Sequence, residues 1–96
     1  MNRYELELLK YAYENYIKTK SKRYTHHFTS TRNLEAYTGA LMYLIEAEHI
    51  LPLSENITPL LKNPGALSFV STKGITIQYE ITDFGIRTYH NRKDTP

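Results

Sequence analysis

The feature that most constrains the fold is residues 75–82, ITIQYEIT, where apolar and polar side chains alternate without a break. Because successive side chains of a β-strand point to opposite faces, this pattern predicts a strand with one face on a core and the other in water. The core-facing residues would be Ile75, Ile77, Tyr79 and Ile81. Thr82 ends the run and can cap a following helix, which we expect to reach about Asn91.

A β-hairpin is predicted around this strand. The segment LSFVS, residues 67–71, is separated from residues 75–82 by Thr-Lys-Gly, and two β-forming runs joined by a short glycine-containing turn are typical of a hairpin over 67–81. The stretch before it, residues 51–66, contains three prolines. We expect that stretch to be mainly a connection, with one helical turn near residues 57–62.

The first half of the chain predicts helices and one short strand. In residues 4–17 apolar side chains recur at steps of three and four, which indicates a helix that Asn2 can cap. Residues 23–29 are rich in β-forming residues and predict a short strand or an extended loop. Residues 33–50 are again helical in pattern, but Thr38-Gly39 interrupts it. We expect a break there, with Thr38 capping a second helix; the alternative is one helix that contains a glycine.

Composition indicates one globular domain, residues 1–96, with 41% hydrophobic and 23% charged residues. The absence of cysteine excludes disulfides and thiolate metal sites. No apolar run is long enough to span a membrane, and the N-terminus carries acids and tyrosines where a signal peptide would be apolar. We therefore expect a cytoplasmic protein.

The net charge of +2 hides two blocks of opposite sign. Residues 18–32 contain five lysines and arginines and no acid, whereas residues 33–61 contain four glutamates and neither lysine nor arginine. A basic block of this kind is either a solvated surface or a set of phosphate contacts.

Two segments resemble the winged-helix superfamily, especially its PadR-like and MarR-like members. The stretch Ile81-Thr82-Asp83-Phe84-Gly85 is similar to the Leu-Thr-acid-X-Gly motif that ends the second wing strand and caps the last helix in that family. ALMYLIEAEHI, residues 40–50, resembles the end of its recognition helix, although Glu48 stands where the family has a glycine. The resemblance implies an α+β winged-helix domain with a three-helix core, a hairpin wing at 67–81 and a short C-terminal helix. It also implies a small DNA-binding transcriptional regulator without a cofactor. We expect it to bind as a homodimer, because one such module buries little surface on DNA.

A DNA-binding winged helix inserts its third helix into the major groove and lays its hairpin along the backbone. We expect the outward face of that helix to carry Thr38, Gly39, Met42, Tyr43 and Glu46, of which Thr38 and Tyr43 could contact bases or phosphates. This face has no lysine or arginine, so the phosphate contacts would come from beside the groove. The residues predicted to supply them are Lys18, Lys20, Lys22, Arg23, Arg32 and Lys73.

The alternative is a protein-binding winged helix, an adaptor or modulator that uses its acidic helix with exposed Met and Tyr residues to contact another protein. The position of the cations separates the two hypotheses. Basic residues that flank the helix over 33–50 favour DNA, and basic residues on the opposite side favour a protein partner.

Neither metal binding nor catalysis is indicated. Adjacent histidines of a strand point to opposite faces, so His26 and His27 are poorly placed to hold one ion, and His49 and His90 belong to no ligand motif. The chain contains no nucleophile elbow and no phosphate-binding loop. We therefore expect a binding protein without metal or cofactor, not an enzyme.

Overall fold

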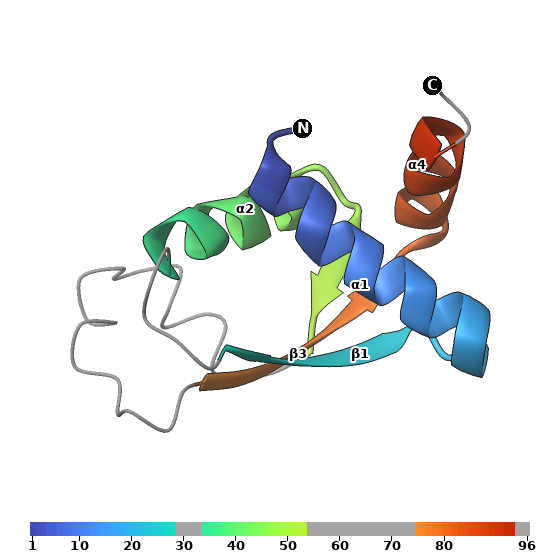
Figure 1. The fold of residues 1–96 in the computed structure, drawn as a ribbon, viewed down its shortest axis with the longest axis horizontal. Coiled ribbons are helices and arrows are strands. Elements are labelled where there is room, and N and C mark those ends of the chain that lie inside the picture. The colour runs from blue at the N-terminus through green and yellow to red at the C-terminus, as the bar shows by residue number, and fades with distance from the viewer. Residues whose placement is uncertain (29–33, 54–74, 94–96) are drawn as a thin grey trace.

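Three helices and a three-stranded antiparallel sheet make up the part of the chain that the computed structural model describes, residues 1–28, 34–53 and 75–93. The domain is therefore of the α+β class, and Figure 1 shows two helices above one face of the sheet. In chain order the elements are α1 (Arg3–Thr19), β1 (Arg23–Phe28), α2 (Leu34–Glu46), β2 (Ile50–Pro52), β3 (Ile75–Ile81) and α4 (Asp83–Lys93).

Helix α1 begins and ends with local signals. The Asn2 side chain accepts the Glu5 N–H at 2.9 Å, and the Glu5 carboxylate accepts the Asn2 N–H at 2.8 Å, which makes a reciprocal capping box. At the other end Lys20 adopts a left-handed conformation and donates its N–H to the Tyr16 carbonyl. The predicted cap and helix are thus confirmed, with one added residue at the start and two at the end.

Strand β3 lies in the middle of the sheet, between β1 and β2. The predicted alternation is confirmed: Ile77, Tyr79 and Ile81 are fully buried, whereas Thr76 and Gln78 are exposed. The exposed face carries polar pairs with β1, in which Thr76 Oγ1 lies 2.8 Å from His27 Nδ1 and Gln78 donates to Thr25.

The sequence pattern does not predict the strand that pairs with β3 through residues 50–52, because it places Ile50 at the end of a helical segment and residues 51–52 in a connection. Its register places Ile50 opposite Ile81 and Pro52 opposite Tyr79. β2 is an edge strand, where a proline that lacks an N–H is tolerated. The other half of the predicted hairpin, residues 67–74, and the helical turn near 57–62 lie outside the described residues.

Helix α2 is continuous from Leu34 to Glu46, so the predicted break at Thr38-Gly39 was wrong. Thr38 is only 3% exposed and packs inward instead of capping a new helix, while a Cβ on Gly39 would meet nothing within 4 Å. A glycine inside a helix costs about 1 kcal/mol relative to alanine. Burial of Leu41 and Leu44 in the core outweighs that cost.

The core lies between the inner face of the sheet and helices α1 and α2. Its centre is Tyr79, whose ring is fully buried and whose hydroxyl donates to the Leu8 carbonyl at 2.8 Å. Helix α4 packs on α1 through Tyr89 and Tyr13, whose ring centroids are 4.8 Å apart. In Figure 1 the C-terminal end of α4 extends away from the sheet.

Helix α2 ends without a glycine. Glu48 takes the left-handed conformation (φ 63°), while His49 donates to Leu44 and Glu48 to Ile45, the paired bonds of a Schellman motif. A non-glycine residue in this conformation costs about 1–2 kcal/mol.

Replacing Glu48 with glycine should therefore raise the free energy of unfolding. The relief of left-handed strain exceeds the added entropy of the unfolded chain, about 0.5–1 kcal/mol, so the expected net gain is about 0.5–1 kcal/mol. Urea unfolding followed by circular dichroism measures it. The control is Glu48→Ala, which removes the same charge but keeps Cβ; an equal gain in both variants would assign the effect to charge and contradict this explanation.

Candidate functional site

Lys18 and Lys20, two of the predicted phosphate contacts, lie away from α2. Glu7 of α1 receives a hydrogen bond from Tyr37 of α2 at 2.9 Å, and Lys18 follows Glu7 by eleven residues, about 16 Å along a helix axis. Lys18 and Lys20 are both exposed at that far end of α1. Figure 1 shows the end of α1 and the body of α2 on opposite sides of the molecule.

The other two described cations of residues 18–32, Lys22 and Arg23, each lie beside an acidic residue. Lys22 Nζ lies 2.7 Å from Asp83 Oδ1, and this hydrogen bond lowers the pKa of the Asp83 carboxyl. Arg23 is exposed and stands opposite Glu80 in the β1–β3 register. Arg32 and Lys73 lie outside the described residues. Of the described predicted phosphate contacts, Lys18, Lys20 and Arg23 therefore lie away from α2, and Lys22 is paired with an acid at the start of α4.

The outward face of α2 is largely as predicted. Gly39, Met42, Tyr43 and Glu46 are exposed. Thr38 is the exception: because it is buried under the helix, the prediction that it contacts bases or phosphates was wrong. The pattern of α2 could not reveal this, since a threonine suits either a cap or an inward position with a bonded hydroxyl.

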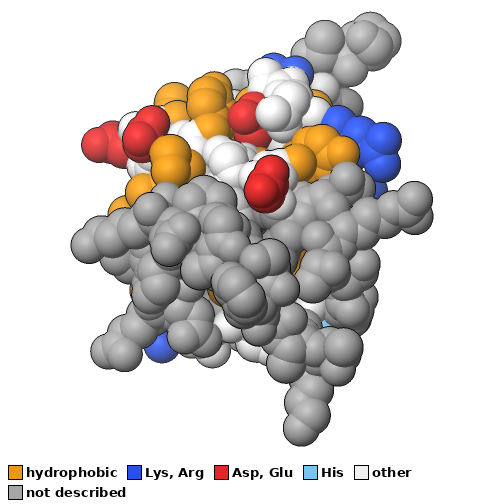
Figure 2. Space-filling view, turned by 90° about the vertical axis from the view of Figure 1, so that its left-hand side faces the viewer, with side chains coloured by type: hydrophobic (Ala, Val, Ile, Leu, Met, Phe, Trp, Pro, Cys, Tyr) orange, Lys and Arg blue, Asp and Glu red, His pale blue; other side chains and the backbone are white. Residues whose placement is uncertain are grey.

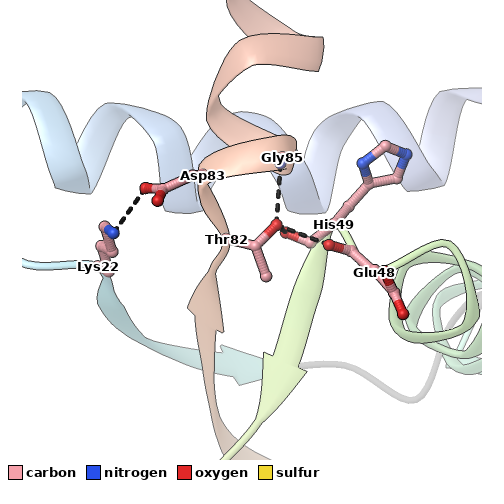
Figure 3. Close-up of polar contacts among 6 residues, drawn as sticks. All are labelled: Lys22, Glu48, His49, Thr82, Asp83 and Gly85. Atoms are coloured by element: carbon pink, nitrogen blue, oxygen red, sulfur yellow. Dashed lines mark hydrogen bonds and ion pairs between the residues drawn. The ribbon is translucent and has the colours of Figure 1, made fainter.

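The end of α2, the end of β3 and the start of α4 meet at one junction, shown in Figure 3. The Thr82 hydroxyl accepts the Gly85 N–H at 2.9 Å, so Thr82 caps α4 as predicted. The same hydroxyl lies 2.6 Å from the Glu48 carbonyl oxygen and 3.1 Å from the His49 carbonyl oxygen. Its single hydrogen is therefore shared between these two acceptors. The Thr82 N–H also donates to His49, at 3.0 Å. These bonds hold α4 against the chain reversal after α2.

An aromatic row lies on this junction. The His49 ring stacks on Phe84 with centroids 4.7 Å apart and 11° between planes, and lies 6.4 Å from the Tyr43 ring. Tyr43 is 42% exposed and Phe84 48%, whereas His49 is 4% exposed. Burial lowers the pKa of His49, so its ring is neutral at pH 7. The row, Tyr43–His49–Phe84, thus presents two accessible rings on either side of a buried ring whose burial favours the neutral form.

Acidic residues border the aromatic row. Glu46 follows Tyr43 by three residues on the same helix, and Glu48 directly precedes His49; both are exposed. Helix α2 contains Glu35 as a third acid and no cation. In Figure 2 acidic side chains lie at the left and centre of the described surface, and most lysine and arginine side chains lie at the right, where they adjoin a hydrophobic patch. The α2 side of the aromatic row is therefore negatively charged and favours a cation, whereas Arg87 follows Phe84 by three residues at the α4 end of the row.

Sequence reasoning found only part of this surface. The sequence predicts Tyr43 as an exposed contact residue, but it offers His49 only as a candidate metal ligand and Phe84 only as part of the family-like motif. The one available signal is a large aromatic residue in the first turn of the last helix, two residues after its cap Thr82.

The histidines form no metal site in the described segments, where no cluster of three or more His, Asp or Glu residues could hold an ion. As predicted, His26 and His27 point to opposite faces: His26 stacks on Tyr11 at 5.4 Å, and His27 is exposed beside Thr76. Within the same segments no helix has the length and apolar character needed to cross a membrane.

Comparison with protein-family models, with curated proteins and with solved structures found no significant match. The arguments for function therefore come from the residues and their geometry.

Proposed function

We propose that the protein is a protein-binding module of winged-helix type, whose aromatic row docks a partner segment that carries both positive charge and apolar side chains. The observation that carries this proposal is the Tyr43–His49–Phe84 row, with two half-exposed rings beside Glu46 and Glu48. Aromatic residues dominate the energetics of protein interfaces, and the charges on the α2 side of the row, Glu46 and Glu48, are both negative.

The order of elements supports the winged-helix assignment. A helix, a strand and a helix precede two strands that pair with each other, and the last of these lies at the sheet centre in the order β1-β3-β2. The stretch from Ile81 to Gly85 joins the last strand to the final helix, as the family motif does. The departure is that α2 alone, among the described residues, stands where the family has a pair of helices.

Electrostatics favours a protein partner over duplex DNA. Phosphate neutralisation supplies most non-specific affinity for DNA, and the outward face of α2 carries only negative charge. The described cations of the predicted set lie at the far end of α1, in a pair with Asp83, or on the outer face of the sheet. Such an arrangement repels a phosphate backbone from the helix that would read bases.

The proposal predicts which peptides the protein selects. A phage-displayed library of random peptides, panned on the immobilised protein and counter-selected on the Tyr43→Ser/Phe84→Ser variant, should yield sequences rich in arginine or lysine together with aromatic or aliphatic residues. A synthetic selected peptide should bind the parent in calorimetry and lose about thirtyfold or more in affinity on the double variant, the effect of removing interface hot spots.

Two controls make this result specific. Ile17→Ser removes an equally exposed apolar side chain from α1 and should leave peptide affinity unchanged. Random duplex DNA, followed by fluorescence anisotropy at low salt, tests the competing function. If the duplex binds, with log affinity falling against log salt at a slope near about −4 to −5, and the selected peptides show no dependence on Tyr43 and Phe84, the DNA hypothesis replaces this one.

A further inference from the structure

A second feature, separate from the aromatic row, is an open cleft of about 580 Å³ between α1 and α4. Helix α4 contacts α1 at Tyr13 in two ways. The Tyr89 ring packs on the Tyr13 ring, and His90 Nδ1 lies 3.1 Å from the Tyr13 hydroxyl. The two helices diverge beyond that contact, as Figure 1 shows. The residues that line the cleft are Arg3, Leu6, Glu7, Lys10, Tyr89 and Arg92.

Helical spacing brings the cations of this cleft together. Arg3 and Lys10 are seven residues apart on α1 and so lie on the same side of that helix. Arg92 follows Tyr89 by three residues on α4, which places both on one face. The walls thus combine three cations with the apolar surfaces of Leu6 and Tyr89.

Glu7, the one acid among the described residues that line the cleft, is engaged by other groups. The Glu7 carboxylate accepts hydrogen bonds from Tyr11 at 2.7 Å and from Tyr37 at 2.9 Å, and the Tyr11 bond is the main cause of its lowered pKa. The cations are held less firmly. Lys10 approaches Glu14 only to 3.9 Å, and the Arg3 guanidinium lies 5.6 Å from the centre of the Tyr4 ring. Within the described part of the lining, three cations against one acid give a net positive charge.

We propose that this cleft binds a small organic anion with a flat apolar body. The arginines would bind the anionic group through their paired N–H donors, and the Tyr89 ring and Leu6 would cover the apolar body. The volume favours such a ligand over an inorganic ion, because small-molecule sites typically occupy about 300–1,000 Å³.

Phenyl phosphate is a suitable probe, with inorganic phosphate and phenol as the matched halves of the molecule. In ¹H–¹⁵N spectra of the ¹⁵N-labelled protein, phenyl phosphate should saturate with a dissociation constant of about 1 mM or lower, the affinity typical of a ligand of its size. The amides of Leu6, Lys10 and Tyr89 should shift, and those of Tyr43 and Phe84 should not. Inorganic phosphate and phenol should each bind at least about tenfold more weakly.

Variants then test the cations. Arg3→Gln and Arg92→Gln change exposed side chains and should each weaken phenyl phosphate binding about three- to tenfold, as expected for loss of one charged hydrogen-bonding partner. Lys20→Gln removes an equal charge outside the cleft and should have no effect. Equal affinity for phenyl phosphate and inorganic phosphate, shifts confined to residues outside the cleft, or no loss in the two arginine variants would each overturn the proposal. Because the NMR readout is independent of peptide binding, a failure of the anion-binding proposal would leave the proposed function unaffected.

Discussion

Replacing Tyr79 with alanine is expected to lower the free energy of unfolding by about 3–5 kcal/mol. Tyr79 is fully buried on the central strand, and its ring meets Tyr24 edge to face with centroids 5.5 Å apart. Truncation would leave a cavity between the sheet and α1 and would remove the hydroxyl that donates to Leu8. A domain of this size has roughly 5–15 kcal/mol of stability in total, so the variant should be folded only marginally.

The conservative variant Tyr79→Phe separates the two causes. It keeps the ring and removes only the hydroxyl, and the Leu8 carbonyl still lies inside helix α1, so the expected loss is about 1 kcal/mol. Guanidinium unfolding monitored by circular dichroism gives both values. If phenylalanine costs as much as alanine, the hydrogen bond and not the packing dominates, and the description of Tyr79 as the centre of the core is wrong.

Replacing Gly85 with alanine is expected to cost about 3 kcal/mol, because there is no room for the added carbon. A Cβ at this position would lie 2.3 Å from the His49 carbonyl oxygen and 3.1 Å from Ile81 Cγ1. The nearer obstacle is backbone, which cannot rotate out of the way, so the first turn of α4 or the chain reversal after α2 must shift. The same shift would separate Phe84 from His49 and weaken peptide binding at the aromatic row.

Gly39→Ala is the matched control for this substitution. It also changes a helical glycine to alanine, but the added carbon meets nothing within 4 Å, so the variant should gain about 0.5–1 kcal/mol from helix propensity. Thermal unfolding of both variants should therefore give changes of opposite sign. A stable Gly85→Ala protein with unaltered peptide affinity would show that α4 does not pack closely on the His49 carbonyl.

Local signals in the sequence predicted much of the architecture. The Asn2 cap, the helix that follows it and the Thr82 cap of α4 each depend on atoms within a few residues, so the pattern alone was sufficient. The alternation of β3 likewise predicted its buried and exposed faces, because one face of a strand packs on a core wherever its partners come from.

Longer-range contacts decided the elements that the sequence left open or misassigned. The three residues of β2 have no periodicity of their own and form a strand only because β3 offers an unpaired edge there. Helix α2 continues through Thr38-Gly39 because its buried leucines and Thr38 pack inward. The free energy of this packing comes from distant segments, so it cannot be predicted from neighbouring residues in the sequence. Local propensity favoured a break, and tertiary packing outweighed it.

The two candidate surfaces were likewise decided by contacts between segments that are distant in the sequence. Tyr43, His49 and Phe84 are separated by up to 41 positions and meet only because Thr82 and Gly85 fix the start of α4 on the turn that follows α2. The cations of the cleft come from both ends of the chain. The sequence alone determined the charge of each segment and the faces of α1 and β3, since these follow from residue type and helix or strand period. Which faces meet was decided by the tertiary structure, because contacts between distant segments depend on how the whole core packs.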